Sequence, residues 1–526
     1  MKNFKLYNNI VGWLVFCIAA ATYLLTIEST ASFWDCGEFI STGYKLDVGH
    51  PPGAPFFMLT AHFFTLFAKD ATQVAVMVNS MSALFSALTI LFLFWTITAL
   101  ARKIVVSGVR SQESGQQMTL AQGIGVLFAG AVGALAYTFS DTFWFSAVEG
   151  EVYAYSSLFT AVVFWAILKW DDVADSADSD RWIVLIAYLM GLSIGVHLLN
   201  LLAIPAIVLV YYCRKYEPTF KGFIVAMLVA VLLLGIVLYG MIPGFVKLAA
   251  VFDLFFVNTL HLPFNSGVVA YIIVAVIVLV GAIWLTARGV EYPRMAAASI
   301  LAVTVVGIPF FGEGGWQTAL LSIAIIGAMA GALYYWRNKV TARFLHTIVL
   351  SVALMLLGYS SYALIVIRSG SDPAMDQNSP DNVFNLKSYL NREQYGDRPL
   401  LYGPSYNAPV ALDIKDNYCV PREKKGAPIY APKPKLDPNE RDEYVITGYK
   451  HDYVMDKRFM MFFPRMYSSQ ASHIEAYKEW GDVKGKRVKY DYCGQTKVDY
   501  KPTFVENMRF FIVYQCHFMY WRYFMW

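Results

Sequence analysis

Eleven apolar stretches of roughly membrane-spanning length constrain this chain more than any other feature. They lie at about 10–27, 73–100, 120–139, 150–168, 182–199, 200–213, 222–242, 268–287, 295–311, 318–336 and 344–367. A helix needs about 20 apolar residues to cross the hydrocarbon core of a bilayer. The composition is 57% hydrophobic and only 15% charged, which excludes a single soluble domain. The sequence therefore predicts an all-α polytopic membrane protein with about eleven transmembrane helices.

Two apolar parts depart from this regular pattern. The stretches 182–199 and 200–213 are short and meet at a polar junction that contains His197. They form either a tight hairpin or one long broken helix. The segment 55–67 is shorter again, and its length suits a helix that lies in the membrane interface.

Basic residues indicate how the chain is oriented in the membrane. Fifteen Lys and Arg residues fall in the alternate loops that include the amino terminus, whereas only Lys45, Lys69 and Lys247 fall in the others. The positive-inside rule then places the amino terminus in the cytoplasm, provided that 182–213 crosses twice. The protein would be a multi-pass protein of the inner (cytoplasmic) membrane, with everything after Arg368 outside.

The first apolar stretch could instead be a cleaved signal peptide, with Ala19-Ala20-Ala21 as its small-residue site. Apolar sequence continues through Leu25, which favours an uncleaved helix.

The chain has a net charge of +4 but contains no basic tract interleaved with aromatic residues. We therefore expect no nucleic acid as a partner. The expected partner is membrane lipid.

The composition changes after residue 367, where Pro, Tyr, Lys and Asp become more frequent. We expect three regions: 1–367 within the membrane, an extracytoplasmic soluble domain of mixed α/β structure at 368–507, and an interfacial or truncated transmembrane segment at 508–526. Cys419 and Cys493 share the outward domain, where a disulfide is permitted.

An acidic segment, FWDCGEF at 33–39, directly follows the first apolar stretch. If it is helical, Asp35 and Glu38 share one face because they are three residues apart. Carboxylates at a membrane surface are costly to desolvate and often mark a functional site. Aromatic neighbours such as Trp34 are expected to raise a carboxyl pKa here. The alternative is a wetted loop whose acids cap a short helix.

A second segment repeats the combination of aromatics and acids. It reads FWFSAVEGEVY at 143–153 and contains Glu149, Glu151 and Tyr153. Two such segments on one face can converge on a cavity, although an aromatic belt with acids at a helix start would look the same.

The sequence contains no Walker A motif, dinucleotide fingerprint, zinc signature or nucleophile elbow. An enzyme of this kind would take its activated substrate from the membrane or from outside.

Together these motifs resemble the GT-C superfamily of polyprenyl-phosphate-sugar-dependent glycosyltransferases. With HPPG at 50–53 and EGEVYA at 149–154, the chain looks like a bacterial family of membrane proteins whose eukaryotic relatives are protein O-mannosyltransferases. The resemblance covers about residues 10–370. It implies a GT-C-like fold, a mannose-like sugar on a polyprenyl phosphate as donor, and Ser or Thr of an exported protein as acceptor.

The resemblance also implies roles for individual residues. Asp35 matches the catalytic carboxylate of the superfamily, and Glu38 lies beside it. As a general base Asp35 would deprotonate the acceptor hydroxyl, and a single displacement would invert the anomeric carbon. The residues available to bind the departing phosphate are His50, His197, Lys247 and Arg368.

Trp34, Glu149, Glu151 and Tyr153 would line the acceptor side or the cavity. Some branches of the superfamily hold a divalent metal with the same acids and others do not, and the two carboxylates permit either. A transporter or flippase of lipid-linked or envelope substrates is the main alternative, because many spans with broken helices also suit transport. A structural subunit that uses the acidic segment for docking is a third possibility.

Overall fold

The structure is a computed structural model that describes residues 3–109, 118–312, 315–396, 398–416 and 418–525. The chain divides into two compact units. Unit 1 comprises Met1–Arg392 and Lys435–Glu443, and unit 2 comprises Glu393–Pro434 and Tyr444–Trp526.

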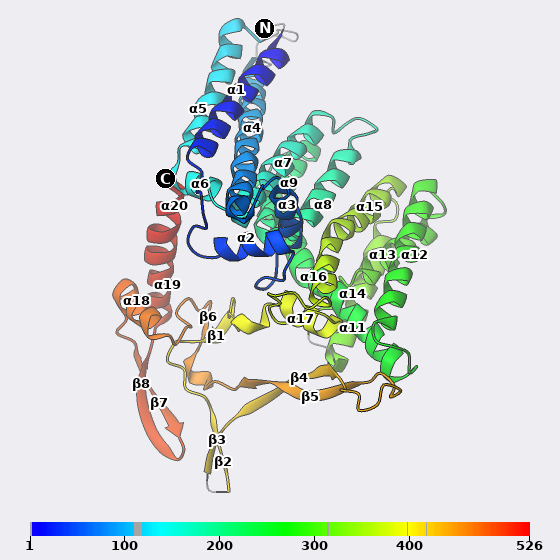
Figure 1. Cartoon of the computed structure of the whole chain (residues 1–526), viewed down its shortest axis with the longest axis vertical. Coiled ribbons are helices and arrows are strands. Elements are labelled where there is room, and N and C mark those ends of the chain that lie inside the picture. Colours follow the sequence, from blue (N-terminus) through cyan, green and yellow to red (C-terminus); the bar gives the residue numbers. More distant parts are fainter. Residues whose placement is uncertain (1–2, 110–117, 313–314, 397, 417, 526) are drawn as a thin grey trace. The chain divides into compact units, whose positions relative to one another are not determined.

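Unit 1 is helical throughout its described secondary structure (Figure 1). Its helices are α1 (Phe4–Leu25), α2 (Cys36–Lys45), α3 (Pro55–Thr65), η1 (Ala71–Gln73), α4 (Val74–Val109), α5 (Leu120–Thr138), α6 (Asp141–Ala147), α7 (Val152–Asp172), α8 (Asp180–Ile194), η2 (Leu198–Ala203), α9 (Ile204–Lys215), α10 (Phe220–Gly235), η3 (Ile236–Met241), α11 (Ile242–Asn258), α12 (Ser266–Arg288), α13 (Tyr292–Val305), α14 (Gly315–Tyr335), α15 (Ala342–Tyr359), η4 (Ser360–Tyr362), α16 (Ala363–Ser369) and α17 (Val383–Leu390).

Within the described residues, nine helical stretches are long and apolar enough to cross a membrane. They are Phe4–Leu25, Ala71–Val106, Leu120–Thr138, Val152–Asp172, Leu198–Lys215, Phe220–Asn258, Ser266–Arg288, Gly315–Tyr335 and Ala342–Ser369. The two other predicted stretches form the shorter helices α8 and α13. Helices satisfy their own backbone hydrogen bonds, which is why apolar runs of this length fold as helices in lipid. The protein is therefore a polytopic membrane protein, as predicted.

The junction between the fifth and sixth apolar stretches is a turn between two helices. Helix α8 ends at Ile194, and η2 leads into α9. At the far end of α9, Arg214 pairs with Asp175, which lies just before α8. Since the end of α9 lies beside the start of α8, the chain runs up one helix and back along the other.

One expectation about the loops is wrong. Lys247 was expected in one of the loops with few basic residues, but residues 242–258 form α11. This helix continues from α10 through the π-helical segment η3. The run from Phe220 to Asn258 is apolar and stays helical past Pro243, which comes just after the π-helical segment η3.

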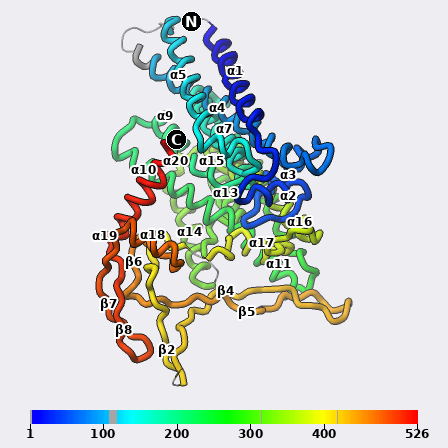
Figure 2. The backbone as a smooth tube through the Cα atoms, turned by 60° about the vertical axis from the view of Figure 1, so that its left-hand side comes forward, coloured from blue at the N-terminus to red at the C-terminus, as the bar shows by residue number. Residues whose placement is uncertain are grey.

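The two ends of the helical unit differ in their contacts. At one end, ion pairs join neighbouring helices: Lys103 with Asp171, and Arg343 with Asp180. Figure 2 shows α1, α4 and α5 running side by side in the same unit. At the other end the connecting segments pack on one another. We call this second end the site end, because it gathers the acidic segments described below.

Unit 2 contains paired strands, short helices and a long carboxyl-terminal helix, which confirms the predicted mixed carboxyl region. Its elements are η5 (Glu393–Tyr395), β1 (Tyr402–Pro404), β2 (Leu412–Lys415), β3 (Tyr418–Pro421), β4 (Glu423–Pro432), β5 (Tyr444–Tyr453), η6 (Lys457–Phe459), β6 (Met460–Phe462), α18 (Ala471–Gly481), β7 (Lys486–Tyr492), β8 (Gln495–Lys501), α19 (Phe504–Phe510), η7 (Phe511–Trp521) and α20 (Arg522–Met525). The strands pair antiparallel as β1–β6, β2–β3, β4–β5 and β7–β8.

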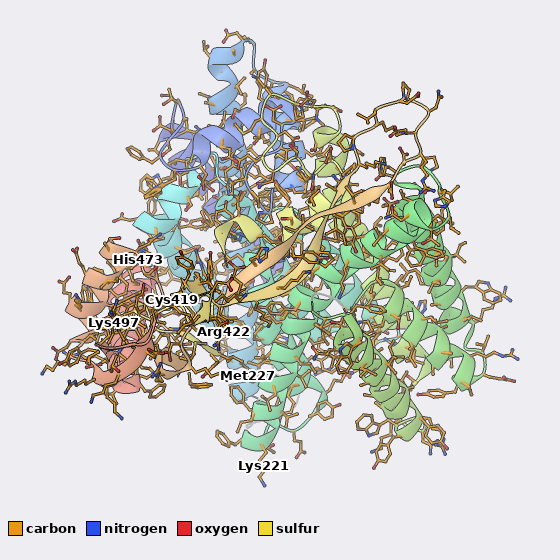
Figure 3. All side chains as sticks on the ribbon, turned by 90° about the horizontal axis from the view of Figure 1, so that it is seen from below. Lys221, Met227, Cys419, Arg422, His473 and Lys497 are labelled. Carbon is orange, nitrogen blue, oxygen red and sulfur yellow. A yellow bond between two sulfur atoms is a disulfide. The ribbon has the colours of Figure 1, made fainter. Side chains whose placement is uncertain are left out.

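A disulfide joins two of these hairpins. It links Cys419 on β3 to Cys493 in the turn between β7 and β8, with the Cα atoms 5.8 Å apart. Figure 3 labels Cys419 beside Arg422, which pairs with Asp413 across the β2–β3 hairpin. Two-stranded hairpins are marginally stable alone, so this crosslink supports strands that have little sheet around them.

Candidate functional site

The first acidic segment forms the start of α2. Asp35 is the N-cap residue of this helix and is exposed, and its side chain makes no capping hydrogen bond. Phe33 and Trp34 are 77% and 88% exposed, so they do not enclose the carboxylates. The expectation that an aromatic frame surrounds Asp35 and Glu38 is therefore wrong for these two rings. Phe39 does pack inward, with its ring centroid 5.6 Å from that of His50.

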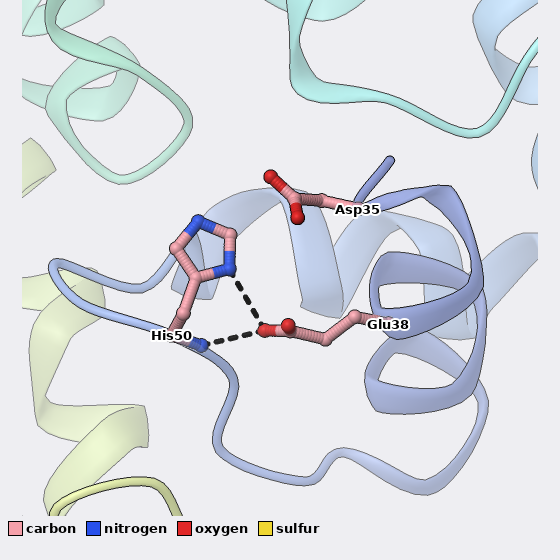
Figure 4. A group of neighbouring side chains, drawn as sticks. All are labelled: Asp35, Glu38 and His50. Atoms are coloured by element: carbon pink, nitrogen blue, oxygen red, sulfur yellow. Dashed lines mark hydrogen bonds and ion pairs between the residues drawn. The ribbon is translucent and has the colours of Figure 1, made fainter. Parts of the chain in front are cut away.

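Glu38 is held by His50 in two ways (Figure 4). Its Oε1 accepts a hydrogen bond from the backbone N–H of His50 at 2.6 Å and lies 2.9 Å from the His50 Nδ1. Asp35 faces this pair, and ligand atoms of all three residues lie within 4.8 Å of one another. Gly49 makes the approach possible, since a Cβ there would lie 2.6 Å from the Glu38 Oε1.

The environment of this pair favours its charged form. Burial raises the pKa of Glu38, but the hydrogen bonds from His50 outweigh it, and the net pKa lies below its ordinary value. The Glu38 hydrogen bond raises the pKa of His50 above its ordinary value, against the effect of burial. Glu38 is thus favoured as a carboxylate and His50 as an imidazolium.

The second acidic segment connects α6 to α7. Glu149 is 5% exposed, and its carboxylate accepts from the Ser32 hydroxyl and the Cys36 thiol, so it reaches the first acidic segment. Glu151 is 6% exposed and caps α7, where its Oε2 accepts from the Val152 N–H at 3.1 Å. The two segments therefore converge at the site end.

The main chain holds this convergence in place. The Glu28 N–H donates to the Val148 carbonyl at 3.1 Å. The Asn79 amide on α4 donates to the carbonyls of Glu28 and Thr30. Gly150 passes so close to α4 that a Cβ there would lie 2.9 Å from the Asn79 Oδ1. A larger residue at 150 would separate the two acidic segments.

Burial dominates the second pair of acids. It raises the pKa of Glu149 above its ordinary value, although hydrogen bonds from Ser32 and Cys36 act the other way. Burial raises the pKa of Glu151 to about 7, opposed by the Val152 N–H and assisted by the charge of Asp35. Burial also raises the pKa of the Cys36 thiol, with further contributions from Glu149 and Glu151. Glu151 thus binds a proton near neutral pH, and burial shifts the pKa of Glu149 in the same direction.

The other residues predicted to bind phosphate, His197, Lys247 and Arg368, have contacts of their own. His197 caps η2, and its ring centroid is 5.5 Å from that of Tyr153. The Lys247 ammonium donates to the Gly312 carbonyl at 2.7 Å. The Arg368 guanidinium donates to the Leu46 carbonyl at 2.7 Å, just past the end of α2 that lies opposite Asp35.

Arg392 is a residue that sequence reasoning missed. Its charge lowers the pKa of His197, after the larger effect of burial, and opposes the rise in the pKa of His50. It follows the last membrane stretch by more than twenty residues, in a region without a recognisable motif. Cys36 was also missed, although its place next to Asp35 was a usable signal.

Asp35, Glu38 and His50 are the residues that fit a divalent cation. Two carboxylates and an imidazole are common ligands for such ions, and their ligand atoms are close enough to share one. Such an ion would supply positive charge at this point of the site.

These features define the class of the protein: a multi-pass membrane protein with acids and histidines gathered where its connecting segments meet. Residues 35–219 match the family model described as Protein O-mannosyl-transferase TMEM260 N-terminal domain. This match begins at Asp35 and includes the acids of both acidic segments. The predicted resemblance to protein O-mannosyltransferases is thereby confirmed for this part of the chain.

Two curated relatives agree with the family match. The chain is 28% identical over 181 residues to Protein O-mannosyl-transferase TMEM260 of Mus musculus, a match that covers 34% of this chain and 22% of the mouse protein. It is 22% identical over 153 residues to Protein O-mannosyl-transferase tmem260 of Dictyostelium discoideum, covering 29% of this chain and 16% of that protein. Residues 396–512 match a family of unknown function, DUF8416.

Proposed function

We propose that this protein is a membrane glycosyltransferase that moves a mannose-like sugar from a polyprenyl phosphate to Ser or Thr of exported proteins. The observation that carries the proposal is the convergence of the two acidic segments inside the part that matches the O-mannosyltransferase family. The convergent acids lie next to membrane-spanning helices, where a lipid-linked donor would present its headgroup.

In the proposed reaction Asp35 acts as the general base. Its exposed carboxylate takes the proton from the acceptor hydroxyl, and the hydroxyl oxygen attacks the anomeric carbon. The bond between that carbon and the phosphate oxygen breaks, and the electron pair leaves with the polyprenyl phosphate. One displacement inverts the anomeric carbon, and the phosphate ester supplies the driving force.

Glu38 and His50 support this step. The hydrogen bonds from His50 hold Glu38 ionised, and the imidazolium can stabilise negative charge that develops on the leaving phosphate. His197, Lys247 and Arg368 remain the other predicted donors to phosphate. A divalent cation held by Asp35, Glu38 and a neutral His50 would supply this stabilisation in place of the imidazolium.

The proposed orientation places the amino terminus on the cytoplasmic side of a bacterial-type inner membrane. The site end and the carboxyl region would then face the extracytoplasmic side. The distribution of basic residues supports this orientation.

A transfer assay with purified protein tests the proposal. We expect sugar transfer from polyprenyl-phosphate-mannose, or a related polyprenyl-phosphate sugar, to a peptide that contains Ser or Thr. The matched control is the same peptide with these residues replaced by Ala. Transfer from a soluble nucleotide sugar in the absence of any lipid donor would contradict the proposal.

A further inference from the structure

The turn that carries His50 is hydrogen-bonded to residues much later in the chain. We call residues 46–53 the histidine turn. The Val48 N–H donates to the Met375 carbonyl at 2.8 Å, and the Gln377 N–H donates back to the Val48 carbonyl at 3.1 Å. Both partners come after the last of the membrane-length helical stretches described above. The course of the histidine turn therefore depends on the end of unit 1.

Tyr389 on α17 also reaches the histidine turn. It is 1% exposed, and its hydroxyl donates to the Gly49 carbonyl at 2.7 Å, with a longer contact to the His50 carbonyl at 3.5 Å. Gly53 leaves room for this hydroxyl, since a Cβ at 53 would lie 2.6 Å from its oxygen. Other apolar residues of α17 are buried in the same core. Packing and hydrogen bonding together fix the Tyr389 side chain against the turn.

The Gly49 carbonyl and the His50 N–H belong to one peptide group. A trans peptide group is planar, so its C=O and its N–H point in opposite directions. The Tyr389 hydroxyl donates to this group at one end, and the Glu38 Oε1 accepts from its N–H at the other end, at 2.6 Å. A donor on the carbonyl polarises the group and strengthens its N–H as a donor. Tyr389 is therefore connected to Glu38 through a single peptide group.

The glycine at 49 makes this connection important. A Cβ at 49 would collide with the Glu38 Oε1, so the close approach requires glycine there. Glycine also gives the backbone more conformational freedom than any other residue. Rotation of the Gly49–His50 peptide plane would turn the N–H away from Glu38. A packed tyrosine hydroxyl on the carbonyl opposes that rotation.

We propose that Tyr389 is a positioning residue whose hydroxyl fixes the Gly49–His50 peptide group, so that the His50 N–H keeps the Glu38 carboxylate in place beside Asp35. Its effect on turnover rests on the proposed function, in which Glu38 and His50 support the departure of the phosphate. Tyr389 lies outside both matched parts of the chain, 35–219 and 396–512, so the assignment comes from this chain's own contacts.

The backbone amide signal of His50 tests the inference without turnover. The chain has eight histidines, so full-length protein labelled with ¹⁵N-histidine in lipid nanodiscs gives a simple NMR spectrum. The signal that disappears in His50→Gln is assigned to His50. Tyr389→Phe removes only the hydroxyl, and we expect the His50 amide proton to shift upfield, because a weaker hydrogen bond deshields it less. The signals of the other histidines should stay in place.

Tyr271 on α12 provides the matched control. It is also 1% exposed, and its hydroxyl donates to the Val305 carbonyl at 2.6 Å. Tyr271→Phe therefore removes the same kind of buried hydrogen bond, and the two variants should lose similar amounts of thermal stability. Tyr271→Phe should leave the His50 amide signal unchanged.

A second variant covers a folding defect in Tyr389→Phe. Replacement of Tyr389 by 3-fluorotyrosine keeps the ring and makes the hydroxyl a stronger donor. The His50 amide proton should then shift downfield, in the opposite direction to the shift in Tyr389→Phe. An unchanged or upfield signal in this variant would overturn the inference.

The transfer assay separates positioning from a purely structural role. Tyr389→Phe should lower kcat by about tenfold, which corresponds to about one hydrogen bond. It should change the KM for the lipid donor by less than about twofold, because the contact acts on the reacting step and not on donor binding. Tyr271→Phe should keep kcat within about twofold of the wild type.

Three results would contradict the inference. They are a His50 amide signal that does not move in Tyr389→Phe, a signal that moves as far in Tyr271→Phe, and an equal fall of kcat in the two variants. If the signal moves as expected and the wild-type protein transfers no sugar, the proposed function is wrong and the positioning of Glu38 by Tyr389 stands.

Discussion

The two acidic segments use the same residue types and reach opposite electrostatic states. Glu38 accepts hydrogen bonds from His50, and its pKa lies below the ordinary value. Glu151 is buried with one backbone donor, and its pKa rises to about 7. The difference shows that hydrogen-bond donors and burial decide the pKa of each acid, and that aromatic neighbours in the sequence do not. Groups with pKa values pushed apart suit different roles in one reaction.

The largest expected effect is a difference in sugar-transfer activity between a variant of the first acidic segment and a variant of the second. Asp35→Asn keeps the size of the side chain but removes its basicity, so sugar transfer should fall by about 10²- to 10⁴-fold. Glu151→Gln mimics the protonated acid and should stay within about tenfold of the wild type at pH 6. Initial transfer rates of both purified variants give the comparison. Similar losses in the two variants would mean that the segments do not differ in role.

The next effect concerns stability and pH at Glu151. Its folded pKa of about 7 lies above the ordinary 4.5, so its contribution is fully present below pH 4.5 and is lost as the pH rises through 7. Replacement by Gln should remove this loss, which is on the order of 3 kcal/mol. Thermal unfolding in detergent between pH 5 and 8 should show a flatter profile for Glu151→Gln. A profile parallel to that of the wild type would refute the raised pKa.

A smaller effect on stability is expected at Glu38, which His50 holds through hydrogen bonds. Glu38→Gln should lower stability by about 2 kcal/mol, because bonds between charged groups at a partly buried site are lost. The lowered pKa of Glu38 makes its contribution present above pH 4.5 and lost in acid. The raised pKa of His50 makes its contribution present below pH 6.5 and lost in alkali. The cost should therefore be largest between these values.

Gly49→Ala provides an independent check on the same contact. Its Cβ would push against the Glu38 Oε1 without removing either partner. We expect a loss of stability in the same pH window as for Glu38→Gln. If Gly49→Ala unfolds like the wild type at pH 6, the Glu38–His50 contact is not what stabilises this turn.

The smallest expected effect tests how closely the two segments approach. Gly150→Ala should cost about 1 kcal/mol, because the new Cβ would crowd the Asn79 Oδ1 and Ile40. Gly281→Ala on α12 is the control, since a Cβ there meets nothing within 4 Å. Unfolding temperatures of the two variants give the difference. A stabilised Gly150→Ala protein would show that the segments have room between them.

Much of the fold could be predicted from local sequence. The apolar stretches form helices because lipid leaves the backbone few alternatives, and the acidic segments are recognisable from a few adjacent residues. The helix at 242–258 was missed because its polar residues, such as Lys247, suggested a loop. The partner of Lys247 lies far along the chain, at the Gly312 carbonyl.

The site was only partly predictable for the same reason. Asp35 and Glu38 are close in sequence, and their proximity to His50 depends on one short turn. Helix α17 reaches that turn from far along the chain, through the Tyr389 hydroxyl that donates to the Gly49 carbonyl. No local pattern indicates such a long-range contact. The exposure of Trp34 depends on a left-handed backbone that sequence alone did not indicate.

The anomeric configuration of the product tests the central claim most directly. If Asp35 is the base in a single displacement, the sugar on Ser or Thr must have the opposite anomeric configuration to the sugar on the polyprenyl phosphate donor. NMR of the glycopeptide made by the purified wild-type protein measures this. The account predicts inversion, and a product with retained configuration would contradict it.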